Sequence, residues 1–367
     1  YFDIVRQGQP DEYRTTFAKG DSLQKVLNDW KPYLESLSDR WPTLVDFEND
    51  LKAKVGPMSI MKPLSERIED IDHYYEDILL SSTPVSDKAV KLTISEFSPV
   101  RGLRVRSQER TLDIMKKSTN SGSPYFSKRR DVVHKTYPCD CEWEGNLVKQ
   151  ILDMHMGEEG YYDSGNLWNA CAVLGWRGQE GGPSDDDVKQ RVVWMFPFAV
   201  NIRELQVYQP LIESCQNFDL VPAWVSMEAV DARITRMFDT KGADDLVICT
   251  DFSKFDQHFN ADMQRCARSI LYHLLTRTPE TKDWLDQIFP IKYMIPLAYD
   301  YGKIRYGKHG MGSGSGGTNA DETLAHRALQ HEAALSQNTR LNPNSQCLGD
   351  DGVLTYPGIT VEDVVRS

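Results

Sequence analysis

Carboxylates placed directly after predicted strands are the residues best suited to chemistry in this sequence. Residues 246–250 form a short apolar run, partly β-branched, which predicts a central strand. Asp251 follows this run directly, and Asp256 lies five residues further on. A charge at the end of a buried strand is costly unless something positive compensates it. The position of Asp251 therefore indicates a cationic ligand.

A second carboxylate pair lies in a predicted hairpin. Residues 346–355 indicate strand, tight turn and strand, because Gly349 and Gly352 bracket the turn. The hairpin would display Asp350 and Asp351 at its tip. Two such strand ends side by side would hold two divalent cations, since Mg²⁺ prefers carboxylate oxygens and substrate phosphates. Two metal ions about 4 Å apart can activate an attacking oxygen and stabilise a leaving one.

A glycine-rich segment between these elements supplies hydroxyl groups. Residues 310–318 contain glycine at five of nine positions, which predicts a mobile loop. Ser313 and Thr318 are candidates for hydroxyl contacts to a ligand. The sequence then turns helical, and Asn319 with Glu322 fits a helix-capping pair. Glu322 therefore has two interpretations, a cap or a ligand contact.

Positive charge is concentrated between Arg101 and Lys135. This segment contains ten Lys and Arg and three Asp and Glu, a net charge of +7, whereas the whole chain of 367 residues carries −12. The total charge excludes a protein that binds nucleic acid through its overall field alone. A local basic patch could still contact phosphates, and a solvated face is the alternative.

A turn-forming loop lies inside this basic segment. Residues 119–125 bring Asn, Ser, Gly and Pro together, which predicts a fixed turn that a nucleic-acid backbone could approach closely. The candidates for contact with such a strand are the short residues of the loop and the cations that follow it, namely Asn120, Ser121, Gly122, Pro124, Lys128, Arg129 and Arg130.

Two further cations accompany a predicted buried strand at residues 192–196. Lys189 and Arg191 are two residues apart, so they share one face of an extended chain. Two cations on one face suit a triphosphate, because a guanidinium offers a fork of donors to phosphate oxygens. An exposed strand edge with solubilising charges is the alternative.

Composition places these features in an ordinary globular protein, with 40% hydrophobic and 26% charged residues. The first ninety or so residues predict polar helices without evident chemistry. The sequence contains no run of eighteen apolar residues and no secretion signal at its start, so we expect no membrane span. The seven scattered cysteines indicate free thiols in a reducing compartment, and a zinc site at Cys139 and Cys141 is the minor alternative.

Taken in order, these motifs resemble those of right-handed viral RNA-dependent RNA polymerases. Residues 251–256 and 313–318 are most similar to the polymerases of small double-stranded RNA viruses, with picobirnaviruses first and partitiviruses next. The resemblance extends over residues 119–352. It rests on five motifs, which are residues 119–125, Lys189 with Arg191, Asp251 with Asp256, Ser313-Gly314 with Thr318, and Gly349-Asp350-Asp351.

The resemblance implies a role for each motif. Asp251 and Asp350 would bind two Mg²⁺ ions, with Mn²⁺ as a substitute, and Asp351 would assist them in catalysis. The 119–125 loop and the cations after it would guide the template. Many single-stranded RNA virus relatives have Asn where this chain has Glu322. Glu322 would be one of the nucleotide contacts. Lys189 and Arg191 would bind the triphosphate of the nucleotide, and Asp256, Ser313 and Thr318 would bind its ribose hydroxyls.

The resemblance also implies an α+β fold, a right-hand polymerase with an antiparallel palm sheet and largely helical fingers. We expect a thumb lobe to be missing from these residues. The implied partners are RNA template and product, NTPs and a viral capsid protein, without a membrane, in the virion interior or the host cytoplasm. The expected domains are a helical extension at 1–95, fingers at 96–245, and a palm at 246–367 with a fingers insertion around 271–310.

Two other functions compete with this one. A reverse transcriptase would use the same metal-binding carboxylates, but it would place a bulky aromatic residue near the sugar, where this chain has Asp256. A non-catalytic RNA-binding or capsid-associated protein could retain decayed motifs. The intact Asp251, Asp350 and Asp351 argue against that second alternative.

Overall fold

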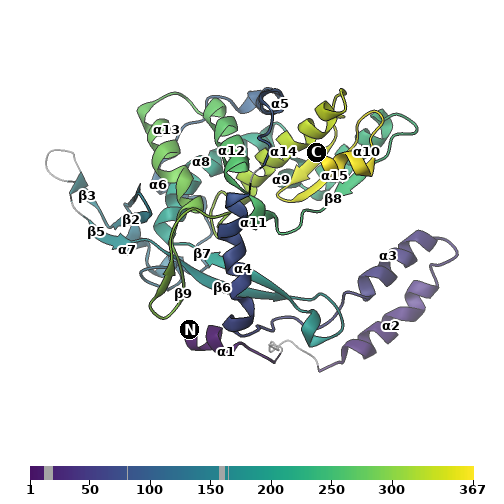
Figure 1. The fold of residues 1–367 in the computed structure, drawn as a ribbon, viewed down its shortest axis with the longest axis horizontal. Helices are drawn as coiled ribbons and strands as arrows, with labels where there is room; N and C mark the ends of the chain where they lie inside the picture. Colours follow the sequence, from purple (N-terminus) through teal and green to yellow (C-terminus); the bar gives the residue numbers. More distant parts are fainter. Residues whose placement is uncertain (12–19, 81, 157–161, 164) are drawn as a thin grey trace. The chain divides into compact units, whose positions relative to one another are not determined.

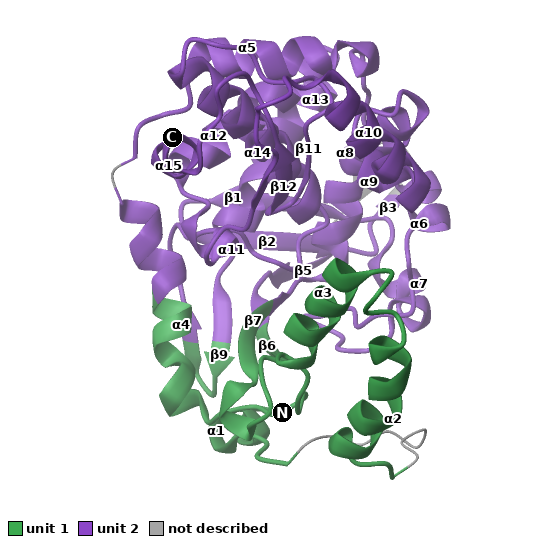
Figure 2. Cartoon of the chain, turned by 90° about the vertical axis from the view of Figure 1, so that its right-hand side faces the viewer, with its two compact units in different colours: residues 1–72, 174–193, 299–303 green, residues 73–173, 194–298, 304–367 purple. Residues whose placement is uncertain are grey.

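The computed structural model describes residues 1–11, 20–80, 82–156, 162–163 and 165–367 (Figure 1). The chain divides into two compact units, shown in two colours in Figure 2. Unit 1 comprises residues 1–72, 174–193 and 299–303, and unit 2 comprises residues 73–173, 194–298 and 304–367. Among the described residues, no helix is both long and apolar enough to cross a membrane.

Unit 1 contains polar helices, as the sequence predicts for the N-terminal region. Ser22 caps the second of them, because its side chain accepts a hydrogen bond from the Lys25 backbone N–H. The helices of this unit are α1 (Phe2–Gln7), α2 (Leu23–Glu35), α3 (Pro42–Lys52), the larger part of α4 (Leu64–Glu76) and the short η4 (Asp185–Asp187).

A four-stranded sheet has the strand order β10-β9-β6-β7, and its residues are divided between the two units. Its strands are β6 (Ala172–Gln179), β7 (Lys189–Met195), β9 (Leu297–Asp300) and β10 (Lys303–Arg305). The predicted strand at 192–196 is therefore present and begins three residues earlier. Along β7 the side chains at 189 and 191 are both exposed, which confirms that these two cations share one face.

Unit 2 is larger and mainly helical. Its helices are η1 (Asp77–Leu79), α5 (Asp87–Glu96), η2 (Ser98–Val100), α6 (Gln108–Ile114), η3 (Arg129–Asp131), α7 (Val133–Thr136), α8 (Phe198–Asn217), α9 (Pro222–Val225), α10 (Met227–Thr240), α11 (Phe255–His258), α12 (Ala261–Leu274), α13 (Pro279–Asp283), η5 (Trp284–Ile288), η6 (Phe289–Tyr293), α14 (Thr318–Ser336) and α15 (Val361–Arg366). Two small antiparallel sheets are formed by β1 (Asp140–Glu144), β2 (Leu147–Leu152) and β5 (Asn166–Asn169), and by β3 (His155–Met156) and β4 (Tyr162–Asp163).

The sheet that carries the predicted carboxylates lies in unit 2. It contains β8 (Ile248–Thr250), β11 (Gln346–Leu348) and β12 (Asp351–Leu354) in the order β11-β12-β8, and both pairings are antiparallel. One hydrophobic cluster joins it to the last turns of α14, where Ala333 and Ala334 are buried with Leu354 and Tyr356. The predicted antiparallel sheet is thus present, and α14 packs against it. The prediction of a central, buried strand at 246–250 is wrong in position: among the described residues β8 begins at Ile248, lies at the edge of this sheet and is only partly buried, because β12 takes the central place.

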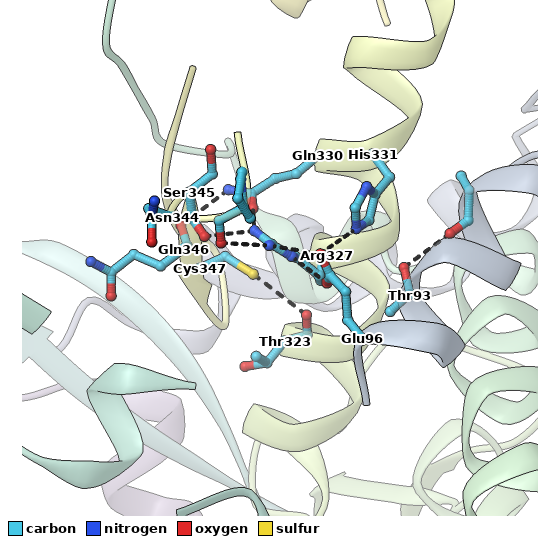
Figure 3. A network of polar contacts seen from close by, with 12 residues as sticks. Thr93, Glu96, Thr323, Arg327, Gln330, His331, Asn344, Ser345, Gln346 and Cys347 are labelled. Atoms are coloured by element: carbon cyan, nitrogen blue, oxygen red, sulfur yellow. Dashed lines mark hydrogen bonds and ion pairs between the residues drawn. The ribbon is translucent and has the colours of Figure 1, made fainter. Parts of the chain in front are cut away.

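A polar network fixes α14 between α5 and the residues that lead into β11 (Figure 3). The Arg327 guanidinium donates to both carboxylate oxygens of Glu96, at 2.8 and 3.0 Å. It also donates to the Ser345 carbonyl at 2.7 Å. His331 Nε2 lies 2.9 Å from Glu96 Oε1. Burial alone would raise the pKa of Glu96, but the charge and hydrogen bonds of Arg327 and His331 lower this pKa to about 2.

Glu96→Gln tests the contribution of this network to stability. A depressed pKa means that the carboxylate stabilises the folded state above its unfolded pKa near 4.5 and loses that effect as the pH falls toward 2. We expect the variant to lose about 2 kcal/mol of unfolding free energy at pH 7. The loss should shrink below about pH 5, as urea unfolding at several pH values would measure.

Glu35→Gln provides the control. Glu35 pairs with Lys31 at 3.6 Å on the surface of α2, and both side chains are exposed. Exposed pairs contribute about 0–1 kcal/mol, so this variant should unfold almost as the parent does. Equal losses for the two variants would show that the Glu96 network adds nothing beyond a surface pair.

Candidate active site

The β11–β12 hairpin places two carboxylates at its tip, as predicted. Leu348 pairs with Asp351, so Gly349 and Asp350 form a two-residue turn. On its other side β12 pairs with β8, where Gly352 lies opposite Thr250. The next opposed positions in that register are Asp351 and Asp251, one residue beyond the last paired residues. Antiparallel pairing therefore brings the end of β8 beside the hairpin tip.

Gly352 allows the two strands to approach α14 closely. A Cβ atom at this position would lie 2.5 Å from Thr250 Oγ1 and 2.7 Å from the Cε1 and Nε2 atoms of His326. Any larger residue would force the Thr250 or His326 side chain, or β12 itself, to shift. The second glycine of the predicted hairpin is thus required by close approach rather than by the turn itself.

Asp251 and Asp256 lie on a short connection between β8 and α11. The Phe252 ring packs at 4.7 Å from that of Phe255 and meets His326 of α14 edge-on at 4.9 Å. These contacts anchor the connection next to Asp251, which is exposed. The backbone carbonyl of Asp256 accepts a hydrogen bond of 2.8 Å from the Met311 N–H, so the glycine-rich segment packs against the start of α11.

Like charges act on one another in this part of unit 2. Burial and the charges of Asp350 and Asp251 raise the pKa of Asp351. Burial, a hydrogen bond to Asp256 and the charges of Asp256 and Asp350 raise the pKa of Glu322 to about 11. The structure therefore brings together five of the predicted site residues as one acidic cluster, Asp251, Asp256, Glu322, Asp350 and Asp351.

This acidic cluster fits divalent cations by its chemistry. Its carboxylates supply the hard oxygen donors that Mg²⁺ and Mn²⁺ bind. Burial, and then the charges of Asp350 and Asp251, raise the pKa of Asp351, and a bound cation would favour its ionised form. Within the described ranges, no group of three or more His, Cys, Asp or Glu side chains is arranged so that it could hold a metal ion. Mg²⁺ usually binds through one or two carboxylates and completes its shell with water and substrate phosphates.

The helix-cap interpretation of Glu322 is wrong. Helix α14 begins at Thr318 with Gly317 as its N-cap, so Asn319 and Glu322 occupy neither capping position. Asn319 instead accepts a hydrogen bond of 2.7 Å from the Trp224 indole. Glu322 is 5% exposed, and its Oε1 atom has no hydrogen-bond partner among the described residues. Its side chain lies in the acidic cluster instead of stabilising the helix end.

The glycine-rich segment is closely packed, which differs from the mobile loop that the sequence predicts. A Cβ at Gly314 would lie 1.7 Å from the Trp194 carbonyl oxygen, so the glycine is needed for contact rather than for flexibility. Ser313 Oγ accepts a hydrogen bond of 3.2 Å from the Trp194 N–H. Thr318 Oγ1 donates to the carbonyls of Gly312 and Ser315, at 3.1 and 3.3 Å. Both hydroxyls therefore already bind backbone groups.

A buried ion pair that the sequence analysis missed supports the start of α14. Lys292 Nζ lies 3.0 Å from Asp321 Oδ2, and both side chains are fully buried. Tyr208 and Tyr293 each donate a hydrogen bond of 2.7 Å to the Asp321 carboxylate. Burial lowers the pKa of Lys292, and the charges of Asp321 and Glu204 oppose that effect. No local pattern signals this pair, because its members are 29 residues apart in the sequence.

The predicted template loop is stabilised by its own backbone. Asn120 Oδ1 accepts from the Gly122 N–H at 2.8 Å, and the buried Ser121 Oγ accepts from the Ser127 N–H at 3.1 Å. Arg129 is turned inward: it donates to Asn201, and its guanidinium lies 5.4 Å from the Phe198 ring centroid. Burial lowers its pKa. Lys128 and Arg130, which follow the loop, are exposed. Pro124, within the loop, is partly buried.

Lys189 and Arg191 belong to unit 1, whereas the acidic cluster belongs to unit 2. Arg191 Nε donates a hydrogen bond of 2.7 Å to Gln179 Oε1 on the neighbouring strand. Both cations are exposed on β7. Their contact with a triphosphate stays a prediction.

A family model described as viral RNA-dependent RNA polymerase matches residues 57–358, which include the whole acidic cluster. The chain belongs to this polymerase family. The "Potential RNA-dependent RNA polymerase" of Human picobirnavirus (strain Human/Thailand/Hy005102) is 62% identical over 369 residues. That alignment covers 100% of this chain and 66% of the relative, so the chain spans slightly less than two thirds of the length of this polymerase.

Solved polymerase structures agree with this assignment. The crystal structure of the RNA-dependent RNA polymerase of a human picobirnavirus has 61% sequence identity and a TM-score of 0.92, covering 100% of this chain and 68% of that one. Its insertion-loop deletion mutant has 61% identity and a TM-score of 0.93, with coverage of 100% and 70%. The Sicinivirus 3Dpol polymerase, at 15% identity and a TM-score of 0.57 over 78% of this chain and 61% of that one, shares the fold.

Glu322→Gln tests the electrostatics of the acidic cluster. Because the pKa of Glu322 is raised to about 11, the folded protein keeps a proton that the unfolded chain loses above about pH 4.5. Folding stability therefore falls as the pH rises between these values, by at most about 1.4 kcal/mol per pH unit. Gln carries no titratable group, so in EDTA we expect the variant to become progressively more stable than the parent from pH 5.5 to 8.

The control for this measurement is Glu142→Gln, at an exposed carboxylate of β1. Its stability curve should run parallel to that of the parent across the same pH range. A Glu322→Gln curve that also ran parallel would contradict a protonated, buried Glu322.

Proposed function

We propose that this chain carries the catalytic site of a viral RNA-dependent RNA polymerase, which transfers nucleotides from NTPs to an RNA 3′ end for viral genome replication and transcription. One observation supports this most strongly. In a member of this polymerase family, the strand register places Asp251 opposite Asp351 with Asp350 in the adjoining turn. These carboxylates come from segments about a hundred residues apart in the sequence. Side chains that the fold brings together from distant segments are typical of a functional site.

Each group of residues has a proposed role. The carboxylates of Asp251 and Asp350 would hold the divalent cations, with Asp351 beside them. When bound, Mg²⁺ or Mn²⁺ would neutralise phosphate charge and activate the attacking 3′-oxygen. The protein's own contribution is positioning, because phosphoryl transfer depends on alignment and charge stabilisation. The proposed triphosphate contacts remain Lys189 and Arg191.

Sugar recognition is proposed for Asp256, Glu322, Ser313 and Thr318. The hydrogen bond between Asp256 and Glu322 supports a shared role for these two residues. The unpartnered Oε1 atom of Glu322 remains able to bind a ligand hydroxyl. The hydroxyls of Ser313 and Thr318 would need to exchange their present backbone partners to take part. This favours Asp256 and Glu322 as the direct contacts.

Template guidance is proposed for the 119–125 loop with Lys128 and Arg130. The inward orientation of Arg129 makes it a support for the loop rather than a phosphate contact. We also propose a right-hand subdivision, with a helical extension at 1–95, fingers at 96–245, and a palm at 246–367 that contains a fingers insertion around 271–310. Association with a capsid protein, and a place in the virion interior or host cytoplasm, stay predictions.

Asp350→Asn tests the metal-binding role. The change keeps the size of an exposed side chain and removes one negative charge, so folding should be unaffected. We expect nucleotide incorporation on a primed RNA template to fall at least about 100-fold, since the positioning of metal ligands dominates this chemistry. RNA affinity, measured by fluorescence anisotropy, should stay within about twofold.

Asp244→Asn provides a matched control, because Asp244 is an exposed carboxylate before β8 and lies outside the acidic cluster. It should incorporate nucleotides at the parental rate. Near-normal incorporation by Asp350→Asn would exclude the proposed role of the hairpin tip.

Asp256→Ala tests sugar recognition. A site that hydrogen-bonds a hydroxyl discriminates against analogues that lack it. Removal of the carboxylate should reduce the preference for ribonucleotides over deoxyribonucleotides by about 1–3 kcal/mol, or roughly 5–150-fold. The ratio of kcat/KM for ATP and dATP measures this preference. An unchanged ratio would place sugar recognition elsewhere.

A further inference from the structure

Two side chains of α14 hold the turn that carries Asp350. Thr323 Oγ1 accepts a hydrogen bond of 2.9 Å from the Gly349 N–H, and His326 Nδ1 donates one of 2.8 Å to the Gly349 carbonyl. Thr323 and His326 are three residues apart, so they lie on the same face of the helix. Both backbone groups of Gly349 are therefore bound to side chains of one rigid element.

His326 also contacts the other strand end. Its ring meets Phe252, the residue after Asp251, edge-on at 4.9 Å, and its Cε1 and Nε2 atoms lie against Gly352. The ring is 2% exposed. The buried His326 side chain thus contacts Phe252, Gly349 and Gly352, each of which is next to one of the three aspartates.

The next residues on this helix face hold the remainder of the hairpin. Gln330 Nε2 donates to the Gln346 carbonyl at 3.0 Å, and Arg327 donates to the Ser345 carbonyl at 2.7 Å, as Figure 3 shows. Arg327 is fixed in turn by Glu96 of α5. Helix α14 therefore binds the first hairpin strand at Ser345, Gln346 and Gly349, so it contacts the hairpin from the start of β11 to the tip.

We propose that Thr323 and His326 are positioning residues of the polymerase reaction, which set the distance between the Asp251 and Asp350 carboxylates by holding the Gly349 backbone. This inference rests on the proposed function of these carboxylates. The hairpin tip carries Asp350 and Asp351 beside the strand end that carries Asp251, so the hydrogen bonds to Gly349 would set how far apart these carboxylates lie. Neither residue touches substrate. Their effect is on the geometry in which the carboxylates meet a divalent cation.

Substitutions of His326 separate positioning from packing. Asn places its amide N–H near the position of Nδ1 and can donate to the Gly349 carbonyl, whereas Gln places its amide near Nε2 and Leu has no donor. All three lose the ring contact with Phe252, so their melting temperatures should fall alike. We expect the dissociation constant for Mn²⁺, measured by electron paramagnetic resonance titration in the presence of a non-hydrolysable NTP analogue, to rise about tenfold in His326→Gln and His326→Leu. In His326→Asn it should stay within about threefold of the parent.

Thr323→Val tests the same restraint without a change of shape, because Val has the form of Thr and lacks the acceptor for the Gly349 N–H. It should weaken Mn²⁺ binding and lower kcat about tenfold while the KM for NTP changes little. It also keeps the test available where a His326 variant does not fold.

The control is His331→Leu on the same helix. It removes the contact with Glu96 and leaves the Gly349 hydrogen bonds intact, so it should lower the melting temperature without weakening Mn²⁺ binding. Equal Mn²⁺ affinities for His326→Asn and His326→Gln, or a parental affinity and kcat for Thr323→Val, would overturn the positioning role. If the parent protein itself neither bound Mn²⁺ nor incorporated nucleotides, the proposed function would fail, and this inference with it.

Discussion

The approach of carboxylates from two distant segments is the constraint on which the acidic cluster depends. Asp251 follows β8, whereas Asp350 and Asp351 lie at the tip of the β11–β12 hairpin. Burial, together with the charges of Asp350 and Asp251, raises the pKa of Asp351, and the surrounding structure restrains the segments that carry these residues. The antiparallel register, the close approach at Gly352 and the hydrogen bonds to Gly349 together provide that restraint.

Helix α14 transmits this restraint to the rest of the unit. At its start, Asp321 is fixed in the core by Lys292, Tyr208 and Tyr293, which determines that the next residue, Glu322, points into the acidic cluster. In its middle, Arg327 binds Glu96 of α5. A buried ion pair contributes little net stability when compared with apolar packing, but removal of one partner is strongly unfavourable. Loss of one partner from either pair would therefore destabilise the placement of the helix.

The sequence was sufficient to predict the strand after residue 246, the hairpin at Asp350 and Asp351, the shared face of Lys189 and Arg191, and the polymerase family. These features depend on local patterns, namely an apolar run, bracketing glycines and alternation along a strand. Features that depend on partners distant in the chain could not be predicted. The glycines near residue 314 suggested a mobile loop, but Gly314 packs against the Trp194 backbone, which is 120 residues away and leaves no local signal. Asn319 and Glu322 matched a capping pattern, but the helix begins at Thr318 and both side chains have tertiary partners. His326 could have been selected only by its spacing from Thr323 on one helix face.

The space around Gly352 has a consequence for a gene that is copied with frequent errors. Every amino-acid change at this position adds at least a Cβ atom where Thr250 and His326 already lie. Such a change forces Thr250, His326 or the start of β12 to shift, one residue away from Asp351. We therefore expect nucleotide changes that keep this codon a glycine codon to be tolerated, and changes that replace the glycine to disturb the acidic cluster.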